Sequence, residues 1–362
     1  MIDHAGKIPA ITVIGAIVAD IVVPLGKDSL FPCPDDDRLV WEGDKEFRTP
    51  PAEVTDAYLK SLPSKIKARL KITYGGQAFA SASVLRELGV DAKLIGAVGD
   101  DAPGKGLIQL LKDRDLGVSG IKIVKGVSTT ANLIFSNKDT GETAYNLSKE
   151  AANEYLEAGD ITDEDLDVSL VHFGGIALNP RLIDNNALSR LIRRIRSKKA
   201  KIGWDTVVDI YGKERSLPVL TSMCEADYLT PSIKEARKIT GEQGVEENLA
   251  FFKRLGAKAV FLKNGENGSE IYTTEESVFG VAAREHVPAV RDIIFLESTG
   301  AGDSYSAYIA YAVAAGLPPV DAARGAAVCG ALTCERVGGG SIGPDPAAAF
   351  RDKMKSYLRQ LS

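Results

Sequence analysis

The second half of the chain alternates between short apolar segments and longer amphipathic ones, and this alternation restricts the folds open to it. Apolar segments typical of buried strands cover 168–175 (VSLVHFGG), 201–205 (KIGWD), 227–231 (DYLTP) and 259–265 (AVFLKNG). Segments with helical spacing separate them, at 182–195, from 234 onward and at 249–255. Such alternation is typical of a mainly parallel sheet with helices on both faces. The sequence therefore predicts an α/β fold.

The first half adds strands to this sheet and contains two stretches of a different character. Strands are expected at 11–15 and 92–98, and a helix is expected to open at Gly75-Gly76. Residues 26–72 are polar, irregular and rich in proline, which indicates an elaboration on the core. Residues 121–147 are rich in β-branched side chains and contain the turn signal Asp139-Thr140-Gly141, which predicts hairpin strands. Since no linker or repeat divides the chain, we expect one domain over 8–355.

Charge and composition argue against nucleic-acid and membrane partners. The net charge is −5, and the most basic stretch, 190–199, has apolar residues at helical spacing, which indicates a solvated helix face. Asp20 interrupts the apolar stretch 8–25, which therefore predicts a strand and not a signal peptide or a membrane span. The four cysteines lack the spacing of a metal site or a disulfide scaffold. We therefore expect a cytoplasmic protein.

The stretch 298–305 (STGAGDSY) carries the chemistry. The apolar run 305–315 follows it and predicts a buried helix that begins near Ala301. Gly300 and Gly302 allow the backbone amides at the positive end of that helix to face a phosphate group. A carboxylate repels phosphate, so the suitable task for Asp303 is to take a proton from an attacking hydroxyl. The alternative is an ordinary helix N-cap at Asp303.

Two other motif matches fail on context. Residues 99–105 satisfy GxxxxGK, but Gly106 stands where a P-loop needs Ser or Thr for magnesium. Residues 338–343 satisfy GxGxxG, yet they follow a helix and precede Pro344, so they predict a loop and not a dinucleotide site. The three histidines have no metal-ligand spacing, which argues against zinc.

Two long segments, in this order, resemble the ribokinase/PfkB family of sugar and nucleoside kinases. Residues 75–107 are similar to its N-terminal signature, and 298–316 are similar to its C-terminal signature. Gly15 and Asp20 match a GxxxxD element. Residues 231–235 stand at the NxxE motif and 263–268 at a glycine-containing nucleotide loop. The resemblance covers almost the whole chain.

The resemblance implies a ribokinase-like three-layer α/β sandwich with a mainly parallel central sheet and a small β-sheet lid, formed by segments near 18–74 and 121–147. It implies transfer of the γ-phosphoryl group of ATP to a hydroxyl group, with Mg²⁺ and, as a further candidate, a monovalent cation such as K⁺. The catalytic roles would fall to Asp303 as base and to the amides of Gly300, Ala301 and Gly302 as anion hole. The acceptor would be bound by Asp20, Gly75 and Gly76. The nucleotide and its magnesium, held through water, would involve Ser232, Glu235, Lys263, Gly265 and Gly268.

Three departures from the family pattern concern the acceptor and the cation. Ala80 stands where the family has a sugar-binding Asn, Ser232 replaces the Asn of NxxE, and Glu297 replaces an Asp near a monovalent-cation site. We therefore expect a sugar or a sugar-like polyol as acceptor, with a nucleoside kinase as alternative, in which Phe31, Trp41, Phe47 and Phe135 could form a wall for a base. A non-catalytic ligand-binding relative is the alternative from another class, although a pure binding protein has no use for Asp303. Exposed lid strands would permit a homodimer.

Overall fold

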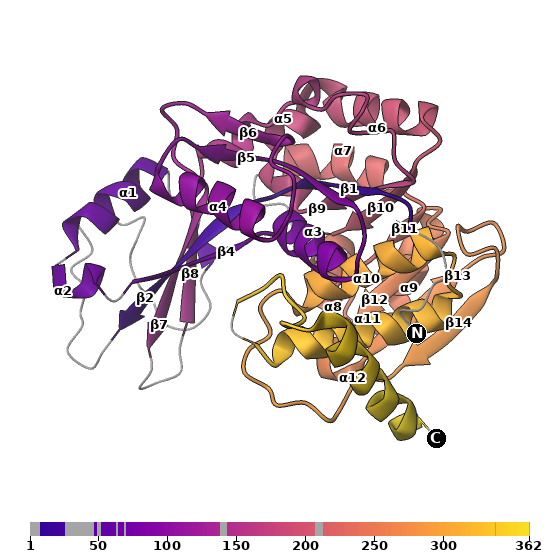
Figure 1. Cartoon of the computed structure of the whole chain (residues 1–362). Coiled ribbons are helices and arrows are strands. Elements are labelled where there is room, and N and C mark those ends of the chain that lie inside the picture. Colours follow the sequence, from indigo (N-terminus) through magenta and orange to yellow (C-terminus); the bar gives the residue numbers. More distant parts are fainter. Residues whose placement is uncertain are drawn as a thin grey trace.

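The computed structural model describes residues 8–25, 47–48, 52–62, 64–68, 70–137, 143–206, 213–336 and 338–361. Its larger sheet has nine strands (Figure 1). Their spatial order is β14 (Ala283–Val287), β13 (Ser269–Thr273), β12 (Ala259–Lys263), β11 (Tyr228–Leu229), β10 (Lys201–Asp205), β9 (Leu170–Gly174), β1 (Ile11–Gly15), β5 (Ala92–Gly99) and β6 (Ile121–Val124). Neighbouring strands are parallel from β12 to β6, and β13 and β14 are antiparallel to their neighbours. The predicted mainly parallel sheet is thus confirmed.

Alternate residues of these strands enter two separate cores, because successive side chains of a strand point to opposite faces. In β12, Phe261 packs into one core while Val260 and Leu262 pack into the other. The first core is closed by α3 (Gln77–Glu87), α4 (Ala102–Asp113), α10 (Ala301–Ala315), α11 (Pro319–Cys334) and α12 (Pro346–Leu361). The second is closed by α5 (Pro180–Ile183), α6 (Ala187–Ser197), α7 (Lys213–Met223), α8 (Ile233–Thr240) and α9 (Val245–Arg254). Helices on both faces give the three layers that the sequence predicts.

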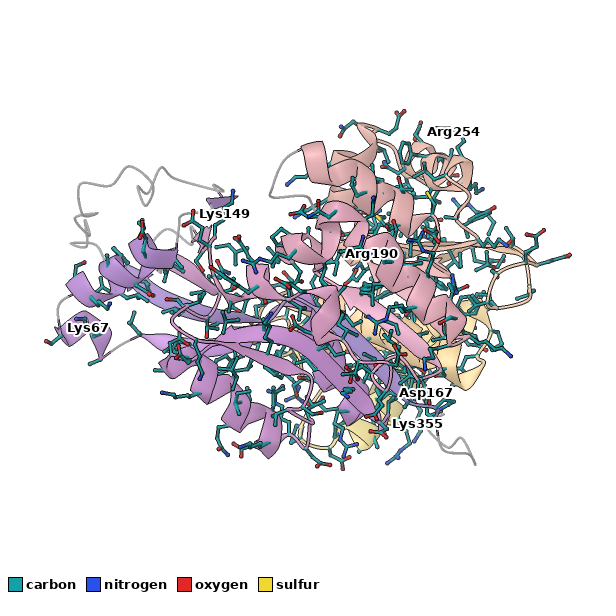
Figure 2. The ribbon with its side chains drawn as sticks, turned by 90° about the horizontal axis from the view of Figure 1, so that it is seen from above. Lys67, Lys149, Asp167, Arg190, Arg254 and Lys355 are labelled. Atoms are coloured by element: carbon teal, nitrogen blue, oxygen red, sulfur yellow. The ribbon has the colours of Figure 1, made fainter. Side chains whose placement is uncertain are left out.

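The helix expected over 182–195 is interrupted. Asn185 and Asn186 have φ of 53° and 58°, and this left-handed backbone separates α5 from α6. Asn tolerates that conformation because its short polar side chain can bond locally. Helix α6 buries Leu188, Leu191, Ile192 and Ile195. Its basic residues lie on the outer side, as Figure 2 shows for Arg190, so the stretch 190–199 is a solvated helix face, as predicted.

A second sheet of five strands lies beside the first (Figure 1). Its order is β3 (Phe47–Arg48), β8 (Thr143–Leu147), β7 (Ala131–Asn137), β2 (Val18–Leu25) and β4 (Lys71–Gly75), with α1 (Ala52–Ser61) and α2 (Ser64–Lys67) between β3 and β4 in sequence. Ile21, Val23 and Leu133 form a small core with Val54 and Tyr58 of α1. One face of this lid sheet is therefore covered by α1, and alternation places Asp20 and Asn132 on the opposite, open face.

The stretch 121–147 divides between the two sheets. β7 and β8 form the predicted antiparallel hairpin in the lid. The strand before them, β6, instead pairs with β5 in the nine-stranded sheet, so only the later part of the stretch belongs to the lid. The apolar residues at the two ends of β6 explain this pairing, since Ile121 and Val124 pack against the two cores of the larger sheet.

Short 3₁₀ turns complete the fold at Ala152–Tyr155, Ala158–Asp160, Ile176–Leu178, Asp184–Asn186 and Gly265–Asn267. In the described segments, no helix combines the length and the apolar character needed to cross a membrane.

Candidate active site

The first turn of α10 forms the centre of the candidate site. The helix begins at Ala301, as the sequence predicts, and its N-cap is Gly300 with φ of 76°. A Cβ on Gly300 would lie 2.6 Å from the Cα of Gly339, so both the backbone angle and the close approach require glycine. The amide of Ala301 donates to the carbonyl of Ser298 at 3.2 Å. Among the three predicted anion-hole residues, Ala301 therefore has a committed amide, in a helix turn whose first N–H groups generally lack intrahelical partners.

Asp303 is the third residue of α10 and not its N-cap. Burial, together with the charges of Asp205, Glu235 and Asp20, raises the pKa of Asp303 to about 7, although Lys263 acts in the opposite direction. A carboxyl group that titrates near neutrality is well matched to proton transfer at physiological pH. The geometry and the pKa thus fit a general base better than a structural cap.

Lys263 faces inward and contacts the first turns of α10. Its Nζ lies 2.7 Å from Oδ1 of Asp205 and donates to Oγ of Ser306 at 3.1 Å and to the carbonyl of Gly302 at 3.4 Å. Burial lowers the pKa of Lys263, but the charges of Asp205 and Glu235 outweigh it and raise this pKa. The ammonium group is therefore charged and ties the ends of β10 and β12 to α10.

Asp205 is a site residue that the sequence did not reveal. It is fully buried at the end of β10, accepts from Oγ1 of Thr230, and its Oδ2 has no hydrogen-bond partner. Burial raises its pKa, which the Lys263 ammonium counteracts. In the sequence Asp205 merely ends the segment KIGWD. The only signal was its place at the carboxyl end of a parallel strand, where functional groups of α/β proteins gather.

Ser232 and Glu235 form a capping box at the start of α8. Oγ of Ser232 accepts from the amide of Glu235, and Oε2 of Glu235 accepts from the amide of Ser232 and from Oγ1 of Thr206. Burial raises the pKa of Glu235, although Lys263 counteracts it. Glu235, the predicted magnesium residue, therefore interacts electrostatically with Lys263. It also stabilises the first turn of α8 as part of the capping box.

Gly265 and Gly268 form the turn after β12. Their φ values are 58° and 82°, and a Cβ on Gly268 would lie 2.2 Å from the carbonyl oxygen of Val287. The turn therefore brings the β12 end back into β13 directly beyond Lys263. The left-handed backbone angles explain why both positions are glycine, and the close approach to Val287 adds a second reason at Gly268. Neither reason involves a nucleotide.

Asp20 lies on the open face of the lid next to the start of α3. Nδ2 of Asn132 donates to its Oδ1 at 3.0 Å, and a Cβ on Gly75 would lie 2.3 Å from its Oδ2. Burial raises the pKa of Asp20 to about 6, and the Asn132 bond lowers it only in part. Gly76 is the N-cap of α3 and packs against the backbone of Ala16. The three predicted acceptor residues are thus brought together.

Two further polar side chains lie around this acceptor half. Gln77 donates through Nε2 to the carbonyl of Thr206 at 3.2 Å, while its Oε1 is buried without a partner. Oδ1 of Asn132 is likewise buried without a partner. Ala80, by contrast, is buried in α3 beneath Gly340. Sequence reasoning focused on the missing Asn at Ala80 and overlooked these two amides.

Comparison with known proteins identifies the family of this chain. The family model described as pfkB family carbohydrate kinase matches residues 53–346. The chain is 26% identical over 286 residues to a ribokinase of Arabidopsis thaliana, which covers 73% of this chain and 69% of the relative. It is 24% identical to an aminoimidazole riboside kinase of Salmonella typhimurium, over 84% of this chain and 93% of the relative.

Solved structures show the same fold. The structure of Arabidopsis thaliana ribokinase complexed with ribose and ATP superimposes with a TM-score of 0.70 at 20% identity, covering 96% of this chain and 99% of that chain. This similarity over nearly the whole chain identifies the fold as ribokinase-like. The chain belongs to the pfkB family of carbohydrate kinases, which are phosphotransferases that act on hydroxyl groups.

Proposed function

We propose that this protein transfers the γ-phosphoryl group of ATP to a hydroxyl of a sugar or sugar-like polyol, with Asp303 as the general base. The observation that carries the proposal is the position of Asp303, with a pKa of about 7, in the first turn of α10. A base and an anion-binding helix terminus in one turn suit the attack of a hydroxyl on a phosphoryl group.

The acceptor half supports a polyol. Oε1 of Gln77 and Oδ1 of Asn132 are buried oxygens without partners, and the Asp20 carboxyl lies beside Asn132. A buried acceptor atom without a donor is costly, and a ligand rich in hydroxyl groups would supply the donors. Of the wall expected for a nucleoside base, Phe31 and Trp41 lie outside the described residues, as do the side chains of Phe47 and Phe135.

The phosphate half supports ATP with magnesium. Gly300 allows the left-handed turn at the start of α10 and the close approach of Gly339, and Lys263 adds positive charge behind the same turn. Glu235 would hold magnesium through water, and the ion would neutralise charge on the phosphates. Lys263 would act on the nucleotide indirectly, by contacting the N-terminal turn of α10. Gly265 and Gly268 would line the nucleotide. Glu297, whose Oε1 accepts from the amide of Gly338, is the candidate near a monovalent cation.

In this mechanism the acceptor hydroxyl loses its proton to Asp303 as its oxygen attacks the γ-phosphorus, and ADP leaves. The amides around Gly302 would stabilise the charge on the transferred group. Asp20, Asn132 and Gln77 would orient the acceptor. We further propose a cytoplasmic location, consistent with the unpaired Cys224, Cys329 and Cys334.

The test is ADP release from MgATP across a panel of sugars, polyols and nucleosides, with Asp303→Asn as the paired variant. We expect turnover with a sugar or polyol, reduced by about 10²- to 10⁴-fold in Asp303→Asn. Calorimetry should show unchanged ATP binding in that variant. Equal turnover by both proteins would exclude Asp303 as the base, and a lack of ATP binding would exclude the kinase.

A further inference from the structure

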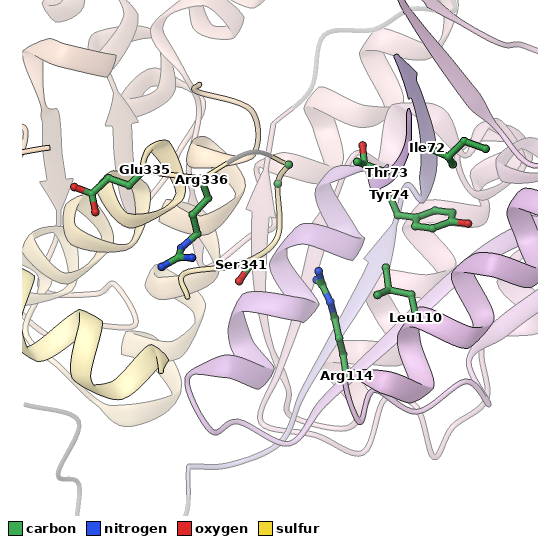
Figure 3. A pocket seen from close by; sticks show the side chains of 10 residues that line it. Ile72, Thr73, Tyr74, Leu110, Arg114, Glu335, Arg336 and Ser341 are labelled. Carbon is green, nitrogen blue, oxygen red and sulfur yellow. The ribbon is translucent and has the colours of Figure 1, made fainter. Parts of the chain in front are cut away.

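A pocket of about 610 Å³ lies beside the proposed acceptor site and is lined by two arginines. Its walls are β4 (Ile72, Thr73 and Tyr74), the end of α4 (Leu110, Arg114) and the loop after α11 (Glu335, Arg336, Gly338, Gly339, Ser341). Figure 3 shows the guanidinium groups of Arg336 and Arg114 on either side of Ser341. The volume is within the range of small-molecule sites.

Two residues that line the pocket are neighbours of proposed active-site residues. Thr73 pairs in register with Asp20 across the lid sheet. On the other wall, Gly339 lies in backbone contact with Gly300 of the catalytic turn. A ligand in this pocket would therefore lie next to a neighbour of Asp20 and next to the loop that packs on Gly300.

Arg336 makes no ion pair with a carboxylate among the described residues, and Glu87 acts on it only through a longer-range electrostatic interaction. Its Nε is buried without a hydrogen-bond partner. The neighbouring carboxylate of Glu335 is paired with Lys353 at 2.7 Å. Leaving a partly buried charge unpaired is costly, so this arginine is suited to a ligand that brings the anion.

Arg114 adds a second positive charge that is held in place. Its Nη1 donates to the carbonyl of Gly340 at 2.9 Å, and its guanidinium lies over the Phe79 ring at 5.4 Å. Glu87 interacts electrostatically with both arginines, but it accepts from the amide of Ile342, and burial raises its pKa. Two guanidinium groups therefore line the pocket, and the carboxylate of Glu335 in its wall is already paired with Lys353.

We infer that this pocket binds an anionic group, phosphate or carboxylate, carried by the acceptor, so that the preferred substrate is a sugar phosphate or a sugar acid. The inference rests on the proposed kinase function and narrows its substrate class. Arginine suits such a group because its planar fork can donate two hydrogen bonds to two oxygens.

The experiment compares matched acceptors: a hexose, its monophosphate, and its hexonic acid, each with wild type, Arg336→Gln and Arg336→Lys. Arg254→Gln, an exposed arginine at the end of α9 (Figure 2), is the control. We expect the KM of a charged acceptor to rise about 10- to 100-fold in Arg336→Gln and less in Arg336→Lys, with the KM of the neutral hexose unchanged. The monophosphate and the acid separate the two anion types.

Calorimetry with the same compounds, without ATP, gives a readout that does not need turnover. Arg336-dependent binding of the monophosphate or acid in a protein without turnover would support the pocket and contradict the kinase. Turnover of the neutral hexose alone, unaffected by Arg336→Gln, would overturn the inference and leave the kinase intact. Arg336-dependent binding of inorganic phosphate without any preference for charged acceptors would also overturn it, since the anion would then not belong to the acceptor. Equal melting temperatures of the variants exclude misfolding.

Discussion

Asp303 lies between two charges that shift its pKa in opposite directions. The carboxylate of Asp205 raises this pKa and the ammonium of Lys263 lowers it, while those two groups are themselves paired at 2.7 Å. The carboxylate form of Asp303 exists above a pH of about 7, so a reaction that uses it as base should accelerate as pH rises through neutrality.

Substitutions in this pair should shift the pH profile in opposite directions. In Asp205→Asn the repulsion is lost while Lys263 stays charged, so the midpoint of kcat/KM should fall by about 1 pH unit. In Lys263→Gln the midpoint should rise. Asp160→Asn, in the exposed pair with Lys122, is the control and should leave it unchanged. A midpoint that stays fixed in both variants would show that another group titrates.

Gly75 is expected to control the position of Asp20. A Cβ there would lie 2.3 Å from Oδ2 of Asp20 and would displace the carboxyl from Asn132. In Gly75→Ala we expect the KM of the acceptor to rise about 10- to 100-fold, because small displacements of a binding group are costly, while the KM of ATP stays constant. Gly117→Ala, with open space around its Cβ, serves as the control. Equal kinetics of the two variants would exclude Asp20 as an acceptor ligand.

At the scale of elements, the capping box of α8 raises the question of whether Glu235 serves the helix or the magnesium. Glu235→Gln keeps an oxygen that can accept from the amide of Ser232 but removes the charge. We expect this variant to need about tenfold more Mg²⁺ for half-maximal rate, with unchanged stability in urea. Ser232→Ala should instead lose about 1 kcal/mol of unfolding free energy and keep its Mg²⁺ dependence. If Glu235→Gln loses stability but not Mg²⁺ affinity, its role is structural.

The order of elements explains which parts of the site could be predicted. Gly300, Gly302 and Asp303 are contiguous, and local rules for a glycine turn before an apolar helix place them correctly. Asp205 and Lys263 are 58 residues apart and meet only because β10, β11 and β12 are neighbours in the sheet. No local pattern encodes that neighbourhood. The break between α5 and α6 has a local cause that the sequence pattern does not show. Two asparagines adopt left-handed backbone angles within an otherwise helical pattern.

At the scale of the whole molecule, β4 is an edge strand of the lid among the residues that the structure describes, and half of Ile72 is exposed there. An edge with an exposed apolar side chain is prone to pair with another chain. We predict a homodimer through the lid, with a mass by light scattering of twice 38.6 kDa. Ile72→Lys should shift it toward the mass of one chain, and because Ile72 also lines the arginine pocket, mass and not activity is the readout. A wild-type mass of 38.6 kDa would contradict the dimer.

The chain passes between the two sheets over very short connections. Only Ala16 and Ile17 separate β1 from β2, and only Gly76 separates β4 from α3. The lid is therefore not an independent unit that could be replaced by the lid of a relative. Its strands β2 and β4 connect almost directly to β1 of the larger sheet and to α3, which covers that sheet. Engineering a new acceptor preference should accordingly proceed by single replacements on the open face of the lid. A lid taken from a relative would have to reproduce both connections before it could change the acceptor preference.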